Sequence, residues 1–280
     1  MKWFKAHGLG NDYLVAVEAS ALTAPRVRAL CDRHRGIGSD GILEPMSTER
    51  ADHGVRIWNP DGSVAEKSGN GLRIYAYWLS RDREAGTRFT VDTGVDVVDC
   101  LVEGTQVTIE MGVATQGPWV DHRLPTSALG SADPRVLHVT EVRIGNPHVV
   151  VWDPGPFDEV PWRAWGAAIE RHPHFPNRTN VQFVEPRPGG AELRIWERGA
   201  GETQASGSSA CAVAFVAANR GHQSWDRPQT LSMPGGVLHV TVRSSGAVVL
   251  RGPVAPVGTM TLDLQYQGDA NDVRGSGEPR

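Results

Sequence analysis

The chain has 280 residues, a formal net charge of −4 at pH 7, 40% hydrophobic residues and 21% charged residues. This length suits one large or two medium domains, and the composition is typical of a globular protein. The negative charge argues against nucleic acid as the main partner, and no apolar run approaches the roughly 18 residues that a membrane span requires.

The N-terminus and the cysteines indicate a cytoplasmic protein. Residues 1–5 lead directly into patterned sequence, without the apolar core of a signal peptide. Cys31, Cys100 and Cys211 are isolated thiols whose spacing fits neither a metal site nor a disulfide framework. We therefore expect cytoplasmic localisation and no metal, and we expect Cys211 to be buried in a core.

Few residues are suited to hold a cofactor. Lys67 is the only lysine near the Gly-rich turns, and nothing beside it marks the pocket that a Schiff-base cofactor would need. No Gly-rich segment follows the templates for dinucleotide or nucleotide phosphate binding. The sequence therefore favours a mechanism without a cofactor.

Short alternating runs rich in β-branched residues predict strands along the whole chain. In chain order these strands include residues 13–17, 89–94, 107–111, 149–151, 231–236, 238–242 and 259–264. The spacing of apolar residues predicts helices over about 25–34, 70–84, 161–170 and 208–219. Because strands outnumber helices, we expect an α+β fold.

Composition divides these elements into two halves. Residues 114–134 are rich in Pro, Gly, Ser and Thr, which is typical of a linker. We expect an N-terminal half over residues 1–115 and a C-terminal half over residues 116–255, with residues 256–266 returning to the first half. Residues 267–280 are polar and Gly-rich, which predicts a disordered tail.

One order of features occurs twice along the chain. In the first half Asn11 follows a glycine, and Ser68 precedes a Gly-rich turn and an apolar run of helical length. Asn146 and Ser206 take the matching positions in the second half at nearly the same spacing. Although Gly-Asn and Ser-Gly pairs are common in turns, their recurrence in order indicates two similar halves. We expect two pseudo-symmetric domains, each a curved, mainly antiparallel sheet wrapped around a central helix, with the active site in the cleft between them.

Each of the two serines precedes the start of a predicted helix. Free N–H groups and the helix dipole at such a start favour an anion such as a carboxylate, and glycines allow a ligand to approach closely. Ser68 and Ser206 could also be ordinary N-caps. Their matched occurrence favours a pair of reactive side chains on opposite faces of one carbon.

Further polar residues lie in turns bounded by Gly or Pro and suit a zwitterionic amino-acid ligand. Side-chain amides both donate and accept hydrogen bonds, a guanidinium can grip a carboxylate, and a carboxylate can hold an ammonium. Taken singly, each asparagine is better explained by turn formation. The candidates are Asn11, Asn59, Asn146, His148, Asn180, Glu197 and Arg198.

Five segments together resemble the motif set of the diaminopimelate epimerase family. They are HGLGNDY at 7–13, NPDGS at 59–63, GNG at 69–71, GNPH at 145–148 and ERGAGET at 197–203. The resemblance covers about residues 3–255. It implies interconversion of LL- and meso-diaminopimelate without a cofactor, in bacterial lysine and cell-wall synthesis. In that reaction one group removes the α-proton while another delivers a proton to the opposite face.

The resemblance also implies roles for individual residues. Ser68 and Ser206 take the positions of the catalytic pair, and His148 and Glu197 would tune that pair. The implied substrate contacts are Asn11, Asn59, Asn146 and Asn180, with Glu197 and Arg198 at its charged groups and Gly69, Asn70, Gly207 and Ser208 at its α-carboxylate.

Three positions with an implied catalytic or substrate-binding role depart from the family pattern. The family has catalytic cysteines where this chain has Ser68 and Ser206, and a substrate-binding glutamine where this chain has Gly41. A thiol titrates near about pH 8.5 and its pKa falls readily at a helix N-terminus. An alkoxide forms only with the help of an adjacent base.

These departures leave several functions open. The protein could be an epimerase or racemase, in which case His148, Glu197 or water would activate the serines. It could also be a one-base isomerase, or a protein that binds an amino acid without turnover. A deliberate Cys-to-Ser trap is disfavoured, because Gly41, Ile74 and Ser209 also depart from the usual pattern. Since the residues with an implied role in substrate binding are retained, we expect an epimerase-like enzyme. We expect a small amino-acid substrate and no nucleic-acid or membrane partner. The sequence leaves open whether it forms a homodimer.

Overall fold

The computed structural model describes residues 1–18 and 21–263. Within them no helix is long and apolar enough to cross a membrane. The predicted disordered tail at 267–280 and the end of the returning segment lie outside the described residues, so those two predictions stay predictions.

Strands dominate the described residues, which confirms the predicted α+β class. The helices are α1 (Ala24–Cys31), α2 (Gly69–Asp82), the 3-10 helix η1 (Thr126–Leu129), α3 (Trp162–Glu170) and α4 (Gly207–Asn219). The first strands are β1 (Lys2–Gly8), β2 (Asn11–Ala16), β3 (Ile42–Met46), β4 (His53–Trp58), β5 (Arg88–Asp92), β6 (Val97–Glu103), β7 (Gln106–Val113), β8 (Thr115–Gln116) and β9 (His122–Pro125). The later strands are β10 (Val136–Ile144), β11 (Asn146–Trp152), β12 (Asn180–Arg187), β13 (Gly190–Glu197), β14 (Gly201–Thr203), β15 (Pro228–Met233), β16 (Gly236–Val242), β17 (Ala247–Pro253) and β18 (Ala255–Thr261).

The order of features that occurs twice in the sequence corresponds to an order of strand pairings that occurs twice in the structure. In the first half β1–β2 is an antiparallel hairpin, β2–β3 is parallel, β3–β4 is antiparallel and β4–β5 is parallel. The second half repeats this order with β10–β11, β11–β12, β12–β13 and β13–β15. Asn11 and Asn146 therefore occupy equivalent turns at the ends of the two hairpins.

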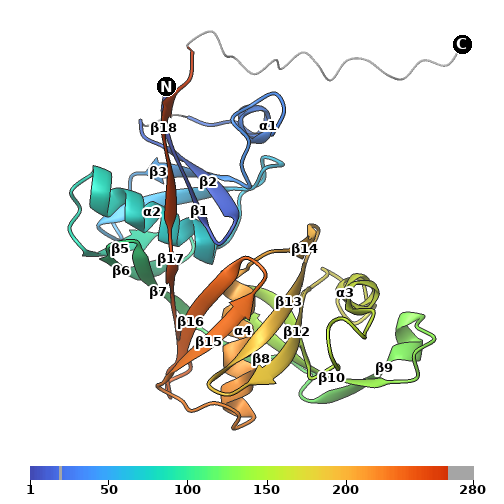
Figure 1. Ribbon diagram of the computed structural model, residues 1–280. Coiled ribbons are helices and arrows are strands. Elements are labelled where there is room, and N and C mark those ends of the chain that lie inside the picture. The colour runs from blue at the N-terminus through green and yellow to red at the C-terminus, as the bar shows by residue number, and fades with distance from the viewer. Residues whose placement is uncertain (19–20, 264–280) are drawn as a thin grey trace, which may run out of the picture.

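The two halves are joined by exchanged strands. β7 and β17 pair antiparallel, so that all the named strands form one continuous mixed sheet. β8 follows β7 but pairs with β10 of the second half, whereas β18 follows β17 but pairs with β1 of the first. Figure 1 shows β18 running from the lower half to the upper half beside β1. Each half is thus closed by a strand that follows the last hairpin of the other half.

The sheet of each half wraps around one buried helix. α4 is apolar on nearly every side, and only its Ser208 and Asn219 are not buried. α2 buries Leu72, Tyr75 and Trp78 in the same way. A helix that is apolar all round belongs in a core. The cores around α2 and α4 merge into one cluster, in which Cys211 is fully buried, as predicted.

Two local predictions differ from the structure. The expected linker at 114–134 carries β8, β9 and η1, and both strands pair with β10, because an exposed sheet edge can recruit even a short polar segment by backbone hydrogen bonds. The first helix ends at Cys31 rather than about residue 34. Asp32 Oδ1 accepts hydrogen bonds from the backbone N–H groups of His34 and Arg35, each at 2.8 Å, which forms a turn instead of another helical turn.

Candidate active site

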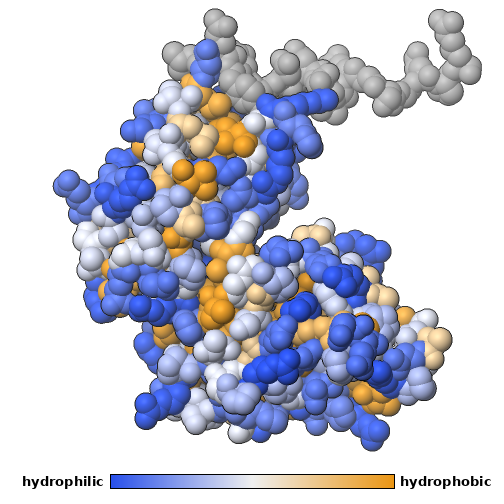
Figure 2. All heavy atoms as spheres, in the orientation of Figure 1, coloured by the Kyte–Doolittle hydropathy of each residue, from blue (hydrophilic) through white to orange (hydrophobic). Residues whose placement is uncertain are grey.

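The helices α2 and α4 begin at glycines that touch each other where the two halves meet. A Cβ atom placed on Gly69 would lie 3.4 Å from Cα of Gly207, and one placed on Gly207 would lie 3.3 Å from Cα of Gly69. The first-turn N–H groups and the positive dipole ends of both helices therefore gather at one place and favour an anion there. Figure 2 shows the indentation that separates the two halves on this face of the molecule.

The two serines lie at the N-cap positions of these helices, but their contacts differ. Ser68 Oγ accepts a hydrogen bond from Gly71 N at 3.0 Å and lies 3.0 Å from the hydroxyl of Tyr13. Ser206 makes no capping hydrogen bond with its side chain, and its Oγ lies 3.5 Å from Ser208 Oγ. The side chain of Ser68 therefore caps its helix, whereas that of Ser206 does not.

On the first half, a chain of hydrogen bonds orients two asparagines at the site. Arg73 Nη2 donates to Asn70 Oδ1 at 2.8 Å, and Asn70 Nδ2 donates to Asn11 Oδ1 at 3.0 Å. Asn11 Nδ2 in turn donates to Asp40 Oδ2 at 2.9 Å. The structure thus brings Asn11 and Asn70 together, and the direction of each amide is set by its neighbour.

Arg73 is a fully buried cation at the start of α2. Its Nη1 donates to the carbonyl oxygen of Gly69 at 3.2 Å, and its Nε has no partner among the described residues. Burial lowers the pKa of Arg73 to about 10, so the guanidinium stays charged at neutral pH. No carboxylate in the described part of the chain pairs with it, which leaves a positive charge close to the two helix ends.

On the second half, His148 holds Asn146 in place. His148 Nε2 lies 2.6 Å from Asn146 Oδ1, and Gln182 Nε2 lies 3.0 Å from His148 Nδ1 and donates to Ser209 Oγ at 3.1 Å. This arrangement assigns the ring proton to Nε2. Burial lowers the pKa of His148 to about 3, and the charge of Arg198 acts in the same direction. His148 is therefore neutral, and both of its ring nitrogens are occupied by groups other than the two serines.

Asn180 joins the start of β11 to the turn after β13. Its Nδ2 donates to the carbonyl oxygen of Pro147 at 2.9 Å, and its Oδ1 accepts from Arg198 N at 2.9 Å. The amide thus ties the beginning of one strand to the turn that follows another. Asn59 similarly directs its Nδ2 to Ser63 Oγ of its own turn at 2.9 Å. Substrate contacts by Asn59 and Asn180 stay predictions.

Glu197 lies at the end of β13 and faces the first half. Its Oε1 accepts a hydrogen bond from Thr203 Oγ1 at 2.7 Å. Burial raises the pKa of Glu197 and the charge of Asp40 adds to this, while the hydrogen bond from Thr203 opposes both. Arg198 is exposed next to it, with its backbone held by Asn180. Among the described residues, Glu197 makes no hydrogen bond to either serine.

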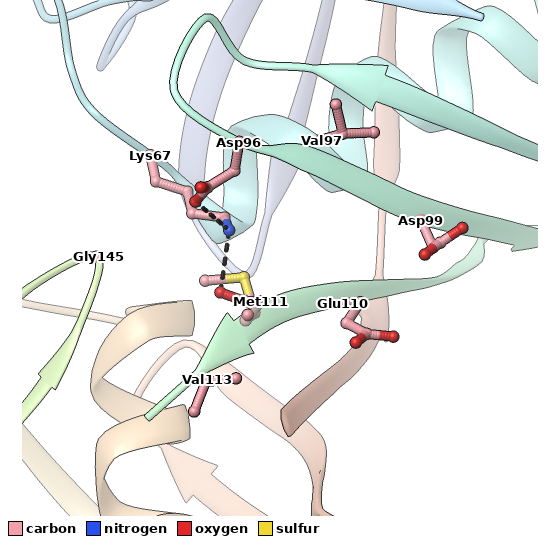
Figure 3. Close-up of a pocket in the computed structure, with 9 residues that line it drawn as sticks. Lys67, Asp96, Val97, Asp99, Glu110, Met111, Val113 and Gly145 are labelled. Atoms are coloured by element: carbon pink, nitrogen blue, oxygen red, sulfur yellow. Dashed lines mark hydrogen bonds and ion pairs between the residues drawn. The ribbon is translucent and has the colours of Figure 1, made fainter. Parts of the chain in front are cut away.

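A polar cavity of about 340 Å³ lies beside the site, between the two halves. Lys67, which precedes Ser68, and Gly145, which precedes Asn146, both line it. Lys67 Nζ donates to the carbonyl oxygen of Met111 at 2.9 Å and lies 3.3 Å from Asp96 Oδ2, as Figure 3 shows. Lys67 is therefore held by an acidic side chain and a carbonyl.

Three residues at the site escaped the sequence analysis: Tyr13, Arg73 and Gln182. The sequence does carry a sign of Arg73, because it is a charged residue within the apolar run 72–79 of a helix that the sheet surrounds. Tyr13 and Gln182 lie in strands of β-branched and aromatic residues. The local sequence of such a strand does not indicate which polar side chain reaches a site.

Comparison with known proteins assigns the chain to a family. Residues 3–116 and 140–257 match the family model for diaminopimelate epimerase. The diaminopimelate epimerase of Synechococcus elongatus is 36% identical over 282 residues, covering 94% of this chain and 99% of that protein. The enzyme of the same name from Heliobacterium modesticaldum is 37% identical over 284 residues, covering 92% and 98%.

A solved structure shares the fold at much lower identity. The hydroxyproline epimerase of Agrobacterium vitis, solved with bound trans-4-hydroxy-L-proline, superposes with a TM-score of 0.68 at 15% identity, covering 94% of this chain and 90% of that one. The two chains therefore share one two-domain fold. With the family model and the relatives at more than a third identity, this chain belongs to the diaminopimelate epimerase family.

Proposed function

We propose that the protein inverts the α-carbon of diaminopimelate without a cofactor, converting the LL- into the meso-isomer for lysine biosynthesis in the cytoplasm. The observation that carries the proposal is the contact between the N-termini of α2 and α4, each headed by a hydroxyl side chain. Two proton-transferring groups on opposite sides of one anion site are what inversion of an amino-acid α-carbon requires. A homodimer stays a prediction.

The substrate α-carboxylate would bind at the helix ends. Gly69, Asn70, Gly207 and Ser208 supply first-turn groups, and the buried charge of Arg73 adds to the two dipoles. Removal of the α-proton moves negative charge onto this carboxylate. Donors that are already aimed at the developing charge stabilise it without further rearrangement.

The remaining residues would orient the rest of the substrate. Asn146 has its Oδ1 engaged by His148, and its Nδ2 makes no hydrogen bond to the described residues, so it is available to donate. Glu197 and Arg198 lie side by side at the rim with opposite charges, which suits an ammonium and a carboxylate. Ser68 and Ser206 would carry the proton on the two faces. His148 would act on the pair only indirectly, by fixing Asn146 and, through Gln182, the first turn of α4.

Proton NMR of LL- and meso-diaminopimelate with the purified protein in D2O tests the proposal. Loss of the α-proton signal together with interconversion of the isomers is the expected result. The Ser68→Ala and Ser206→Ala variants serve as controls, because each removes one hydroxyl without adding a new group. If diaminopimelate binds in calorimetry but no α-proton is lost, the protein is an amino-acid binder and the proposed activity is wrong.

A one-base isomerase is a second candidate function, favoured by the unequal contacts of the two serines. Ser68 has a phenolic partner, whereas Ser206 Oγ has, among the described residues, only the hydroxyl of Ser208 as a partner. Such an enzyme would exchange the α-proton of a substrate with solvent but would not invert the carbon. The same spectra distinguish the two candidates, because they follow exchange and inversion separately.

A further inference from the structure

We propose that Tyr13 and Ser68 form a proton-transfer pair that serves one face of the substrate, so that the two halves of the site are chemically unequal. This inference rests on the proposed function and specifies how a serine can replace a thiol in it. It concerns a residue that lies outside the motif roles described above.

The geometry of the pair is specific. Tyr13 lies on β2 with its ring buried at 6% exposure, and its hydroxyl is 3.0 Å from Ser68 Oγ. Ser68 Oγ also accepts the N–H of Gly71, which fixes the serine rotamer at the start of α2. With one lone pair engaged, the serine can take a proton from one side and give its own to Tyr13 on the other.

The position of the Tyr13 ring depends on Gly41. A Cβ atom on residue 41 would lie 2.6 Å from Tyr13 Cε1 and 2.4 Å from the carbonyl oxygen of Trp58, so any side chain there would displace the ring. The backbone of Gly41 is also tied to β2, since Leu14 N donates to its carbonyl oxygen at 3.1 Å. Gly41 and Ser68 both depart from the family pattern, and both lie against Tyr13.

The surroundings make Tyr13 a strong base once it is ionised. The charged and titratable groups that influence it are Glu197 of β13, Asp40 before β3 and Cys31 of α1. Burial raises the pKa of Tyr13 to about 12, the three groups act in the same direction, and the hydrogen bond to Ser68 opposes them. The phenol is therefore neutral at rest, and its ionised fraction grows tenfold with each pH unit below that value.

The opposite face has no comparable partner. Ser206 Oγ contacts Ser208 Oγ at 3.5 Å, and no titratable side chain among the described residues hydrogen-bonds to it. Of the two side chains that the sequence offers as activating bases, His148 has both ring nitrogens engaged elsewhere, and Glu197 accepts a hydrogen bond from Thr203 and makes none to Ser206 among the described residues. The base that a serine needs is thus present on the Ser68 side alone.

The proposed step balances without another reactant. The Cα–H bond of the substrate breaks, and its proton goes to Ser68 Oγ as the serine proton passes to the ionised oxygen of Tyr13. The negative charge moves from Tyr13 to the substrate carboxylate, where the helix ends and Arg73 stabilise it. Return of a proton from Ser68 to the same face restores the ionised Tyr13 and gives exchange with retention, whereas inversion requires that Ser206 Oγ deliver its proton to the opposite face and regain one from solvent.

The test compares exchange and inversion in D2O for the wild type, Tyr13→Phe, Ser68→Cys and the combination of these two substitutions. LL- and meso-diaminopimelate are the probes, and Tyr75→Phe is the matched control, since Tyr75 is another buried tyrosine whose hydroxyl donates to the Gly54 carbonyl at 2.9 Å. We expect exchange to outpace inversion for one α-configuration and to rise with pH. Tyr13→Phe should lower exchange about 100-fold and flatten the pH profile. Tyr75→Phe should change neither the rate of exchange nor its pH profile.

The Ser68→Cys background separates a chemical role from a structural one. A thiol needs no phenolic partner, so adding Tyr13→Phe there should change the rate less than about threefold. Equal losses in both backgrounds, or a Tyr13→Phe variant with the wild-type rate and pH profile, would overturn the proposal while leaving the proposed function intact. A wild type that exchanges no α-proton would overturn both.

Discussion

Gly69 and Gly207 bring the starts of α2 and α4 so close that the Cα of one lies 3.4 Å from where a Cβ of the other would stand. Two positive helix ends repel each other, and the buried guanidinium of Arg73 lies against the same place. Three positive features therefore converge where no described carboxylate neutralises them. A bound carboxylate would relieve this unfavourable arrangement of positive charges. The electrostatic free energy gained in this way favours binding of an α-amino acid.

Separating the two helices should weaken binding. In Gly207→Ala the new Cβ would lie 2.9 Å from Leu250 Cδ2 and 3.3 Å from the Cα of Gly69, so the helix ends must move apart. We expect the affinity for meso-diaminopimelate in calorimetry to fall about tenfold, which is about 1.4 kcal/mol. Gly86→Ala is the control, because nothing lies within 4 Å of a Cβ there although its φ of 78° makes the substitution mildly destabilising. Equal affinity in both variants would contradict the role of the helix contact.

Removing the charge of Arg73 should affect ligands more than folding. In Arg73→Met the protein loses hydrogen bonds to Gly69 and Asn70 but no longer buries an unpaired cation, and these changes in the free energy of unfolding oppose each other. The stabilisation that saturating diaminopimelate gives in thermal melts should shrink markedly, because the carboxylate loses its nearest charge. Arg73→Lys should retain more of it. If diaminopimelate raises the melting temperature of Arg73→Met as much as that of the wild type, the charge of Arg73 does not act on the bound ligand.

Restoring thiols at both serine positions should raise turnover. Combining Ser68→Cys with Ser206→Cys places two thiols at helix N-termini, where thiol pKa values fall and the thiolate forms readily. We expect the rate of interconversion of LL- and meso-diaminopimelate, followed by NMR, to increase by about 100-fold or more. A double variant that folds, binds and shows no gain would mean that the pocket geometry, and not the proton-transferring group, limits the reaction.

Stability should fall in acid because His148 is buried in its neutral form. Its pKa is about 3 in the folded protein and about 6.5 in the unfolded chain, so below pH 6.5 only the unfolded chain gains the proton. This contribution to stability is complete above pH 6.5, and it decreases by about 1.4 kcal/mol for each pH unit below that value. Urea unfolding at pH 6 and pH 5 measures the slope, and His148→Gln should reduce it by that amount. The same slope in the variant would show that His148 is protonated in the folded state.

Much of the fold was accessible from local pattern. The helices predicted at 70–84, 161–170 and 208–219 agree with α2, α3 and α4 to within two residues at each end, because apolar spacing and flanking glycines are local signals. The repeat of Asn11 and Ser68 by Asn146 and Ser206 predicted the two similar halves. The composition of residues 114–134 predicts a linker, because the short strands there form by pairing with β10 and have no pattern of their own.

The sequence by itself determined the α+β class, the repeat, the family resemblance and the positions of the two serines. Only the tertiary structure decided what each serine contacts, because Tyr13 lies far from Ser68 along the chain and reaches it through the wrapping of β2 over α2. It also decided that Arg73 pairs with no carboxylate in the described part of the chain and that both ring nitrogens of His148 have partners other than the serines. Periodicity reports which face of an element is buried, whereas hydrogen bonds and charges between distant residues depend on how the elements pack.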